Sequence, residues 1–280
     1  MAAFLRLLCA CLLAMLAGCT AAPVAVSSAP AREAAEAANA AAFWFAARGA
    51  LTSTGALRVG VYAGSPSSLV RDPKTGKPAG VAHDLGVALA QEFGMPLKVV
   101  EFERLALVLD ALKAGEVDFT FTNATEMRAR DVDFTPTLLQ LELGFLVPAG
   151  SRLASMADVD QAGVRIGISQ GSSTQAALPR VLKAATLSPA ASLQVAQRML
   201  QSGEVQAFAT NKGILFELAD ALPGARVLDG RWGLESMAIA IPKGRETAMP
   251  YLTQFAQSLR GSGRLQAMVL RAGLRGTVSN

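Results

Sequence analysis

Two internal repeats constrain the fold of this 280-residue chain more than any other feature of its sequence. The segment LRVGVYAGS (57–65) aligns without gaps with VRIGISQGS (164–172), and LKAGEVDFTFTN (112–123) aligns with LQSGEVQAFATN (200–211). The first pair shares an arginine, two glycines and a serine, and the second pair shares Gly-Glu-Val and Thr-Asn. Because both pairs occur in the same order, the sequence predicts two halves built alike, the second more compact between its repeats.

Hydrophobic periodicity inside each half indicates alternating strands and helices. LRVGVY and VRIGIS alternate like strands with one buried face, whereas DLGVALAQEF places Leu85, Leu89 and Phe93 on one side of a helix. RLALVLDALKAG (104–115) repeats the helical spacing. This order predicts parallel or mixed sheets with right-handed crossovers, and ligands of such sheets bind beyond the carboxyl ends of strands. The polar residues that follow predicted strands are therefore candidates for a site.

The N-terminus predicts export. An apolar run of signal-peptide length ends in Leu-Ala-Gly-Cys, which resembles the bacterial lipobox. We therefore expect residues 1–18 to be a signal peptide and Cys19 to be lipidated, anchoring the protein at the periplasmic face of a membrane. The alternative is an ordinary secretory signal cleaved near Ala17 or Ala22. Both interpretations place the mature protein outside the cytoplasm.

Composition narrows the class of protein further. Cys9 and Cys11 fall inside the predicted signal, so Cys19 has no partner and the mature chain must be stabilised by its own core. About 260 mature residues suffice for one large or two medium domains. The net charge of +4 is modest, and no basic run with interleaved aromatics indicates nucleic-acid binding. No second segment is long and apolar enough to span a membrane.

An alanine-rich segment, residues 19–55, is predicted to be a tether that contains a helix. Alanine has the highest helix propensity, and Gly49 offers a stop. The aromatic cluster Phe43, Trp44 and Phe45 is expected to pack on the body of the protein rather than against lipid.

Two polar clusters follow predicted strands of the first half. Ser67 and Ser68 follow the strand that ends near Tyr62, where a simple turn is the plainer interpretation. The second cluster follows EVDFTF and brings together hydroxyl, amide and guanidinium groups. An arginine in such a bend is usually solvated, but a guanidinium can also bind a carboxylate through two parallel hydrogen bonds. Arg130 competes with Arg128 as the candidate for binding a carboxylate, but we expect Arg130 at the surface. The second cluster consists of Thr122, Asn123, Thr125 and Arg128.

Two further clusters follow strands of the second half. In QGSST, Ser172 or Ser173 is expected to cap the helix that continues through QAALPRVLKAA, and free amides at a helix start can bind an anion. Pure helix capping is the alternative. Thr210 and Asn211 are the counterparts of Thr-Asn in the first half, so we expect them to face it across a cleft.

These segments, taken in order, resemble the solute-binding proteins of bacterial ABC importers, in particular the family that captures amino acids and related polar solutes. GKPAGVAHDLGVALAQEFG resembles the family's Gly-x-x-x-Asp-Leu segment, TEMRARDVDFT its Thr-x-x-Arg…Asp-Phe signature, RIGISQGSST its second-lobe anion turn, and MAIAIPKG its return to the first lobe. The similarity runs from about residue 57 to residue 276.

The resemblance implies an α/β protein with the two-lobe periplasmic binding protein type 2 fold, in which two hinge strands join the lobes. It implies a monomer without cofactor or metal that captures a small anionic or zwitterionic solute and docks on an ABC permease in the inner membrane. Carried over to this chain, lobe 1 comprises 56–143 and 236–280, lobe 2 comprises 144–235, and the hinges run through ELGFLVP and GLESMAI.

The same resemblance assigns roles within the clusters. Arg128 aligns with the arginine that holds the ligand's carboxylate, Asn123 and Thr125 fall where the family offers hydroxyl or backbone contacts, and Ser173 falls where the second lobe contacts that carboxylate. Thr122, Ser172, Ser67 and Ser68 complete the expected ligand contacts, together with Asn211.

Two departures from the family pattern concern the ligand's ammonium. Asn211 stands where amino-acid binders usually have an aspartate, and Ser67, Ser68 and Leu69 stand where an aromatic usually covers the ligand. A buried ammonium beside an uncharged asparagine would lose its counter-ion. The sequence therefore suggests a small carboxylate-bearing solute that need not be a standard α-amino acid.

Two alternatives remain open at this point. One is a periplasmic enzyme on the same scaffold, similar to cyclohexadienyl dehydratase, which would need an acid or base in the cleft. His83, the only histidine, is expected to be structural, and Glu142 and Glu235 near the hinges are the acids to test. The other alternative is a sensor lipoprotein that has lost transport.

Overall fold

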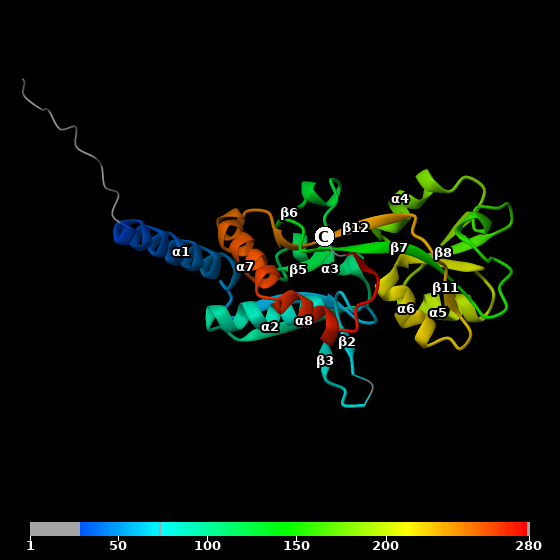
Figure 1. Cartoon of the computed structure of the whole chain (residues 1–280), viewed down its shortest axis with the longest axis horizontal. Helices are drawn as coiled ribbons and strands as arrows, with labels where there is room; N and C mark the ends of the chain where they lie inside the picture. Colours follow the sequence, from blue (N-terminus) through cyan, green and yellow to red (C-terminus); the bar gives the residue numbers. More distant parts are fainter. Residues whose placement is uncertain (1–28, 73, 279–280) are drawn as a thin grey trace, which may run out of the picture. The chain divides into compact units, whose positions relative to one another are not determined.

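A computed structural model of the chain describes residues 29–72 and 74–278 (Figure 1). The predicted signal peptide and the predicted lipidation site at Cys19 lie outside the described residues. Within these ranges no helix combines the length and the apolar character of a membrane span.

Helices and strands alternate along most of the described chain, as the periodicity predicts. The helices are α1 (Ala29–Leu51), α2 (Val81–Phe93), α3 (Leu105–Lys113), α4 (Ser173–Val181), α5 (Leu193–Gln201), α6 (Lys212–Asp220), α7 (Met249–Gly261) and α8 (Arg264–Arg271). The strands are β1 (Leu57–Tyr62), β2 (Val70–Arg71), β3 (Pro78–Ala79), β4 (Leu97–Phe102), β5 (Thr120–Asn123), β6 (Val132–Phe134), β7 (Leu139–Val147), β8 (Arg165–Ser169), β9 (Thr186–Ala190), β10 (Ala207–Asn211), β11 (Arg226–Val227), β12 (Gly233–Pro242) and β13 (Thr277–Val278).

One mixed sheet runs through the molecule in the order β5-β12-β7-β10-β8-β9. β7 and β12 lie side by side in the middle of Figure 1 and pair antiparallel from Gly233 opposite Leu143 to Met237 opposite Leu139. Beyond Met237, β12 continues against β5 and β6, whereas beyond Leu143 β7 continues against β10. Two strands therefore connect the two ends of the sheet. This arrangement confirms the predicted two-lobe α/β architecture with two hinge strands.

Separate hydrophobic cores stabilise the two ends of the sheet. The largest cluster is built on α2, α7 and α8 and contains the fully buried Phe119, with Leu85, Leu89 and Phe93 on the predicted face of α2. Two smaller clusters lie under β8, β10 and their helices, one of them around Phe208. Each end therefore buries apolar surface of its own, and the cluster around Phe208 also packs Tyr62 of β1 and Val108 of α3 against the second end.

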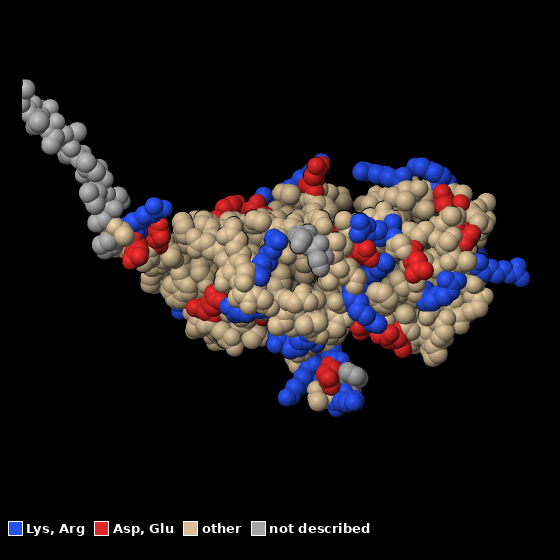
Figure 2. Space-filling model, in the orientation of Figure 1, with Lys and Arg blue, Asp and Glu red and all other residues tan. Residues whose placement is uncertain are grey.

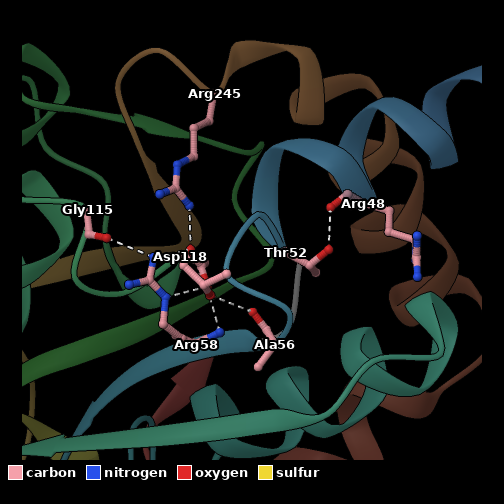
Figure 3. Close-up of polar contacts among 8 residues, drawn as sticks. Arg48, Thr52, Ala56, Arg58, Gly115, Asp118 and Arg245 are labelled. Atoms are coloured by element: carbon pink, nitrogen blue, oxygen red, sulfur yellow. Dashed lines mark hydrogen bonds and ion pairs between the residues drawn. The ribbon is translucent and has the colours of Figure 1, made fainter.

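The internal repeats fold alike in atomic detail. In the first, the Arg58 guanidinium donates to the Gly115 carbonyl (2.8 Å), and the Arg58 backbone N–H donates to Asp118 (2.7 Å) (Figure 3). In the second, Arg165 donates to the Gly203 carbonyl (3.1 Å), and its backbone N–H donates to Gln206 (2.9 Å). The sequence alignment places each pair of these residues in register.

The repeated glycines show why that sequence recurs. Gly115 has φ 71° and Gly203 has φ 72°, a left-handed conformation that residues with a side chain rarely adopt. In both copies the glycine ends a helix and turns the chain towards the next strand, so that its carbonyl is free to accept from the arginine. The shared Gly-Glu-Val is therefore a helix-to-strand turn.

Two predicted helix ends are wrong. α1 passes through Gly49 and continues to Leu51, which is fully buried in the first core. α4 ends at Val181 instead of continuing through the alanines. Leu182 is already extended, and the ring of Pro179 restricts the helix around it.

The expected packing of the aromatic cluster is confirmed for Trp44, whose indole N–H donates to the Glu92 carbonyl (3.0 Å), but Phe45 stays exposed.

Charged side chains are interspersed over the face shown in Figure 2, with lysines and arginines next to aspartates and glutamates. Many of them form surface ion pairs, such as Arg71 with Glu101 and Arg264 with Glu92. Such exposed pairs contribute little to stability. The buried ion cluster of the first repeat, in which Arg58 and Arg245 pair with Asp118, is different.

We expect Asp118→Ala to destabilise the fold much more than Gln206→Ala, its counterpart in the second repeat. Asp118 is fully buried and accepts from both Arg58 and Arg245, so its loss strands two largely buried cations. Breaking a buried ion pair costs about 3–5 kcal/mol, whereas a neutral hydrogen bond contributes about 1 kcal/mol. Urea unfolding of both variants measures the difference, and equal losses would contradict this account of the cluster.

Candidate ligand-binding cleft

A cavity lies between the two ends of the sheet and is lined by both internal repeats. Thr122 and Asn123 at the end of β5 contribute one side, and Thr210 and Asn211 at the end of β10 contribute the other. Both pairs lie at carboxyl ends of strands, where the fold rule predicts a ligand. The cavity has a volume of about 40 Å³, which accommodates only a few water molecules.

The predicted site residues divide into two groups. Ser68, Thr125 and Arg128 do not line the cavity. Ser68 Oγ accepts from the Tyr62 N–H (2.9 Å), and Thr125 Oγ1 accepts from the N–H of Arg128 (3.2 Å). The predicted residues that line the cavity are Ser67, Thr122, Asn123, Ser172, Ser173 and Asn211.

Arg128 is buried directly behind Thr122 and Asn123, with 8% of its surface exposed. One guanidinium nitrogen, Nη1, donates to Thr122 Oγ1 (3.0 Å) and to the Asn123 carbonyl (2.9 Å). Among the described residues no carboxylate pairs with this cation. Burial lowers the pKa of Arg128 from its ordinary value, and the negative charge of Glu235 partly opposes that shift. An anion bound in the cavity would therefore stabilise a charge that the protein leaves uncompensated.

The turn before α4 forms the facing wall. Ser172 is the helix cap, because its side chain accepts from the Gln175 N–H (3.2 Å), as predicted. Gly171 has φ 72°, and a Cβ at this position would stand 2.7 Å from the Cβ of Ala106 in α3. The missing side chain thus allows the start of α4 to approach the other side of the cleft closely.

Glu235 on β12 connects the two sides of the cavity. Its carboxylate accepts from Ser173 Oγ (2.7 Å) and from Asn211 Nδ2 (3.1 Å), and its surface is only 6% exposed. Ser173 and Asn211 come from the α4 and β10 end of the sheet, whereas β12 extends to β5. The carboxylate lines the cavity itself.

Asn211 consequently has a role that the sequence alone did not indicate. Its Oδ1 accepts from the Ile214 N–H (3.1 Å) and caps α6, and this orients its amide nitrogen towards Glu235. The acid that the family pattern leads one to expect at position 211 is thus replaced in space by a carboxylate from β12. Glu235 was considered from sequence only as an enzymatic acid, because its distance along the chain from Asn211 hides their contact.

An aromatic side chain also reaches the cavity from an unexpected position. Tyr62, the last residue of β1, lines it, and its hydroxyl donates to Ser65 Oγ (3.2 Å). Burial raises the pKa of the Tyr62 phenol. The sequence shows no aromatic in the turn that contains Ser67, but the strand before that turn supplies one.

The other titratable candidates lie elsewhere. Glu142 pairs with Lys212 (2.6 Å) and Arg231 (3.1 Å), and the hydrogen bond from Lys212 lowers the pKa of this carboxyl. His83 contacts Asp84 (2.9 Å). Neither residue lines the cavity, and both contacts are those of a structural role. Arg130 is exposed, as expected.

Sequence reasoning missed two charged residues of the cavity wall, Glu103 and Arg104. Arg104, the residue before α3, lines the cavity together with its neighbours Glu103 and Leu105. Its position at the carboxyl end of β4, after Phe102, fits the same fold rule that led to the other candidates. The helical pattern of the segment drew attention to its apolar residues only.

Comparison with known proteins agrees with this geometry. The family of bacterial extracellular solute-binding proteins, family 3, matches residues 57–272, and the chain belongs to this family. The expected membership is thereby confirmed.

Individual relatives are distant. A glutamine-binding protein of Geobacillus stearothermophilus is 24% identical over 62% of this chain and 68% of its own length. The ABC transporter glutamine-binding protein GlnH of Bacillus subtilis is 21% identical over 70% and 72% of the two chains.

Solved structures share the fold. The solute receptor for L-cysteine of Neisseria gonorrhoeae superposes with a TM-score of 0.71 at 23% identity and covers 81% of this chain and 93% of its own. The ancestral amino acid-binding protein AncCDT-1, a precursor of cyclohexadienyl dehydratase, superposes with a TM-score of 0.68 at 22% identity over 79% and 96% of the chains.

Proposed function

We propose that this protein is the substrate-binding component of an ABC importer and captures a small carboxylate-bearing solute, an amino acid, between two closing lobes. The observation that carries the proposal is the uncompensated, buried guanidinium of Arg128 beside a cavity whose facing wall is the start of α4. Membership of the solute-binding family and the amino-acid binders among its relatives support the same class of ligand.

The charges around the cavity favour a zwitterion over a simple acid. Arg128 would bind the carboxylate, shared with the hydroxyls and free amides at the start of α4. Glu235 would bind the ammonium. A carboxylate has about four acceptor positions, of which Ser173 and Asn211 occupy two, so it can accept further hydrogen bonds from a ligand. This assignment removes the objection that Asn211 raised against an α-amino acid.

Ligand entry requires the cavity walls to separate, because Ser173 contacts Glu235 directly and the free space holds only a few water molecules. We infer hinge bending at β7 and β12 between lobe 1 (56–143 and 236–280) and lobe 2 (144–235), followed by closure on the ligand. The ligand-loaded form would then dock on a permease in the inner membrane.

We expect Arg128→Ala to weaken amino-acid binding by more than tenfold. Truncating one partner of a buried charge pair costs about 2–5 kcal/mol, and every tenfold in Kd corresponds to about 1.4 kcal/mol. Titration calorimetry against the twenty standard L-amino acids identifies the tightest binder of the wild-type protein and measures its loss. Arg130→Ala, an exposed arginine on the same turn, is the matched control. A change below twofold in Arg128→Ala would exclude Arg128 from the site.

The Glu235→Gln variant tests whether the ligand is a zwitterion with an ammonium group or a simple carboxylic acid. The substitution preserves the shape of the side chain but removes the counter-ion of the ammonium, so we expect the tightest amino acid to bind more than tenfold more weakly. Its analogue without the amino group should bind the variant at least as well as it binds the wild-type protein. Thermal unfolding checks that the variant folds. If wild-type protein binds the deaminated analogue but no amino acid, the ligand is a simple carboxylate.

The N-terminal segment is proposed to anchor the protein to the membrane, with Cys19 lipidated after removal of residues 1–18 and residues 19–55 acting as a tether. We expect the wild-type protein in the membrane fraction of bacteria, labelled by radioactive palmitate. Cys19→Ser should be neither labelled nor retained, whereas Cys9→Ser, inside the signal, should behave like the wild type. Recovery of the wild-type protein in the soluble fraction would rule out the anchor and leave ordinary secretion.

A dehydratase is the second candidate, because a buried carboxylate in the cavity could serve as a general acid or base. The likeness to a precursor of cyclohexadienyl dehydratase concerns the fold alone, at 22% identity. Turnover of prephenate that is lost in Glu235→Gln would establish the enzyme. Binding of an amino acid without turnover of prephenate favours the importer, and a permease and an ATPase encoded beside this gene would favour it over a sensor.

A further inference from the structure

Arg104 is one of two charged residues of the cavity wall, with Glu103, that the proposed contacts leave without a role. Its side chain lines the cavity from the lobe 1 side, just before α3. Within the described residues its guanidinium forms no ion pair and no hydrogen bond, and its Nε is buried without any partner. The arginines of the buried ion cluster behave differently, because both Arg58 and Arg245 pair with Asp118.

An unpartnered buried donor of this kind requires an explanation. Burying a hydrogen-bond donor without an acceptor is unfavourable, and the penalty is larger for a charged group. Binding sites tolerate such groups because the ligand supplies the missing partner. Arg104 therefore points to an anionic or strongly accepting group on whatever fills the cavity.

The position of Arg104 separates it from the end of the cavity that would hold the amino-acid backbone. Glu235 and Asn123 belong to the hinge side, where Glu235 pairs with Leu141 of β7 and Asn123 pairs with Met237 of β12. Glu103 and Ser192, by contrast, line both the cavity and a second groove that opens to the surface between Ala63 and Val195. Arg104 follows Glu103 in the chain, so it lies towards this outer mouth, where the side chain of a bound amino acid would extend.

We propose that Arg104 is a specificity-determining residue that binds a second anionic group, so that the ligand is an acidic α-amino acid. The inference rests on the proposed function. Arg128 and Arg104 supply two positive charges and Glu235 one negative charge, for a net charge of +1 on these three groups. A ligand with two carboxylates and one ammonium has a net charge of −1 and complements them. A neutral amino acid would leave the Nε of Arg104 buried without a partner.

Glu103, a second charged residue of the cavity wall, would favour a cationic side chain over an acidic one on the ligand. Its carboxylate also lines the cavity and would attract a ligand with a cationic side chain. Glu103 is exposed, however, so water screens its charge, whereas the Nε of Arg104 is shielded from water. We therefore expect the half-buried Arg104 to influence the choice of ligand more than the exposed Glu103 does.

The test is titration calorimetry of the full-length protein with L-glutamate, L-aspartate and their amides L-glutamine and L-asparagine, together with L-arginine. Each acid and its amide have nearly the same shape and differ in charge. We expect the wild-type protein to bind one of the acids at least tenfold more tightly than its amide. In Arg104→Gln that acid should lose at least tenfold in affinity, while the amide should bind within about twofold of its wild-type affinity. Arg198→Gln, an exposed arginine on α5, is the control and should change neither affinity.

The possible results separate this inference from the function on which it rests. Equal or tighter binding of the amides by the wild-type protein, or an equal effect of Arg104→Gln on acid and amide, overturns the role of Arg104 and leaves the amino-acid importer intact. Tightest binding of L-arginine, abolished by Glu103→Gln, overturns it in favour of a cationic ligand. Absence of binding by all five of these ligands overturns the role of Arg104, and absence of binding by all twenty amino acids of the earlier titration overturns both proposals. Arg104→Lys keeps the charge and should retain part of the preference for the acid, which shows that a loss in Arg104→Gln is not caused by misfolding.

Discussion

The hydrogen bonds to the Glu235 carboxylate are the interaction on which the arrangement of the cavity wall depends. Ser173 and Asn211 approach from one end of the sheet, and the strand that carries Glu235 extends to the other. A buried carboxylate needs such donors, because an unpaired charge in the interior costs several kcal/mol. Ser173, Asn211 and Glu235 all fall within the proposed lobe 2 (144–235), so hinge bending between the lobes leaves these bonds inside one lobe. The same bonds therefore fix the position of the carboxylate that gives the cavity its negative charge.

The duplicated architecture explains why two similar strand ends perform different tasks. In each half a Thr-Asn pair ends a strand and faces the cavity. In the first half, Thr122 and the backbone of Asn123 hold the guanidinium of Arg128. In the second half, Asn211 caps α6 and donates to Glu235. The same local structure thus orients a cation on one side and a carboxylate on the other, which places the two charges that a zwitterion needs on a common frame.

The sequence predicted the fold well because the signals that define it are local. Alternating apolar residues, the Gly-Glu-Val turn and the serine cap at Ser172 act over a few residues, and the structure contains each of them. The candidate site was predicted in part. The polar clusters at strand ends do line one cavity, but Glu235 contacts Asn211 across 24 positions of the chain, and no local pattern reveals that contact. Arg104 was missed for a related reason. It is the N-cap residue of α3, and no local sequence pattern shows that a residue at this position lines a cavity.

The small size of the cavity follows from contacts that a ligand would have to replace. Gly171 packs its backbone against Ala106, and Ser173 reaches Glu235 directly, so the walls touch both near the mouth and near the hinge. A bound amino acid would hold these walls apart by the width of the ligand while supplying hydrogen bonds to both of them. Its carboxylate would neutralise Arg128 and its ammonium would take up acceptor positions of Glu235 that the protein leaves open. The energetic difference between the closed forms with and without ligand is therefore electrostatic in large part, and it is concentrated on two buried groups of opposite charge that no protein partner fully neutralises.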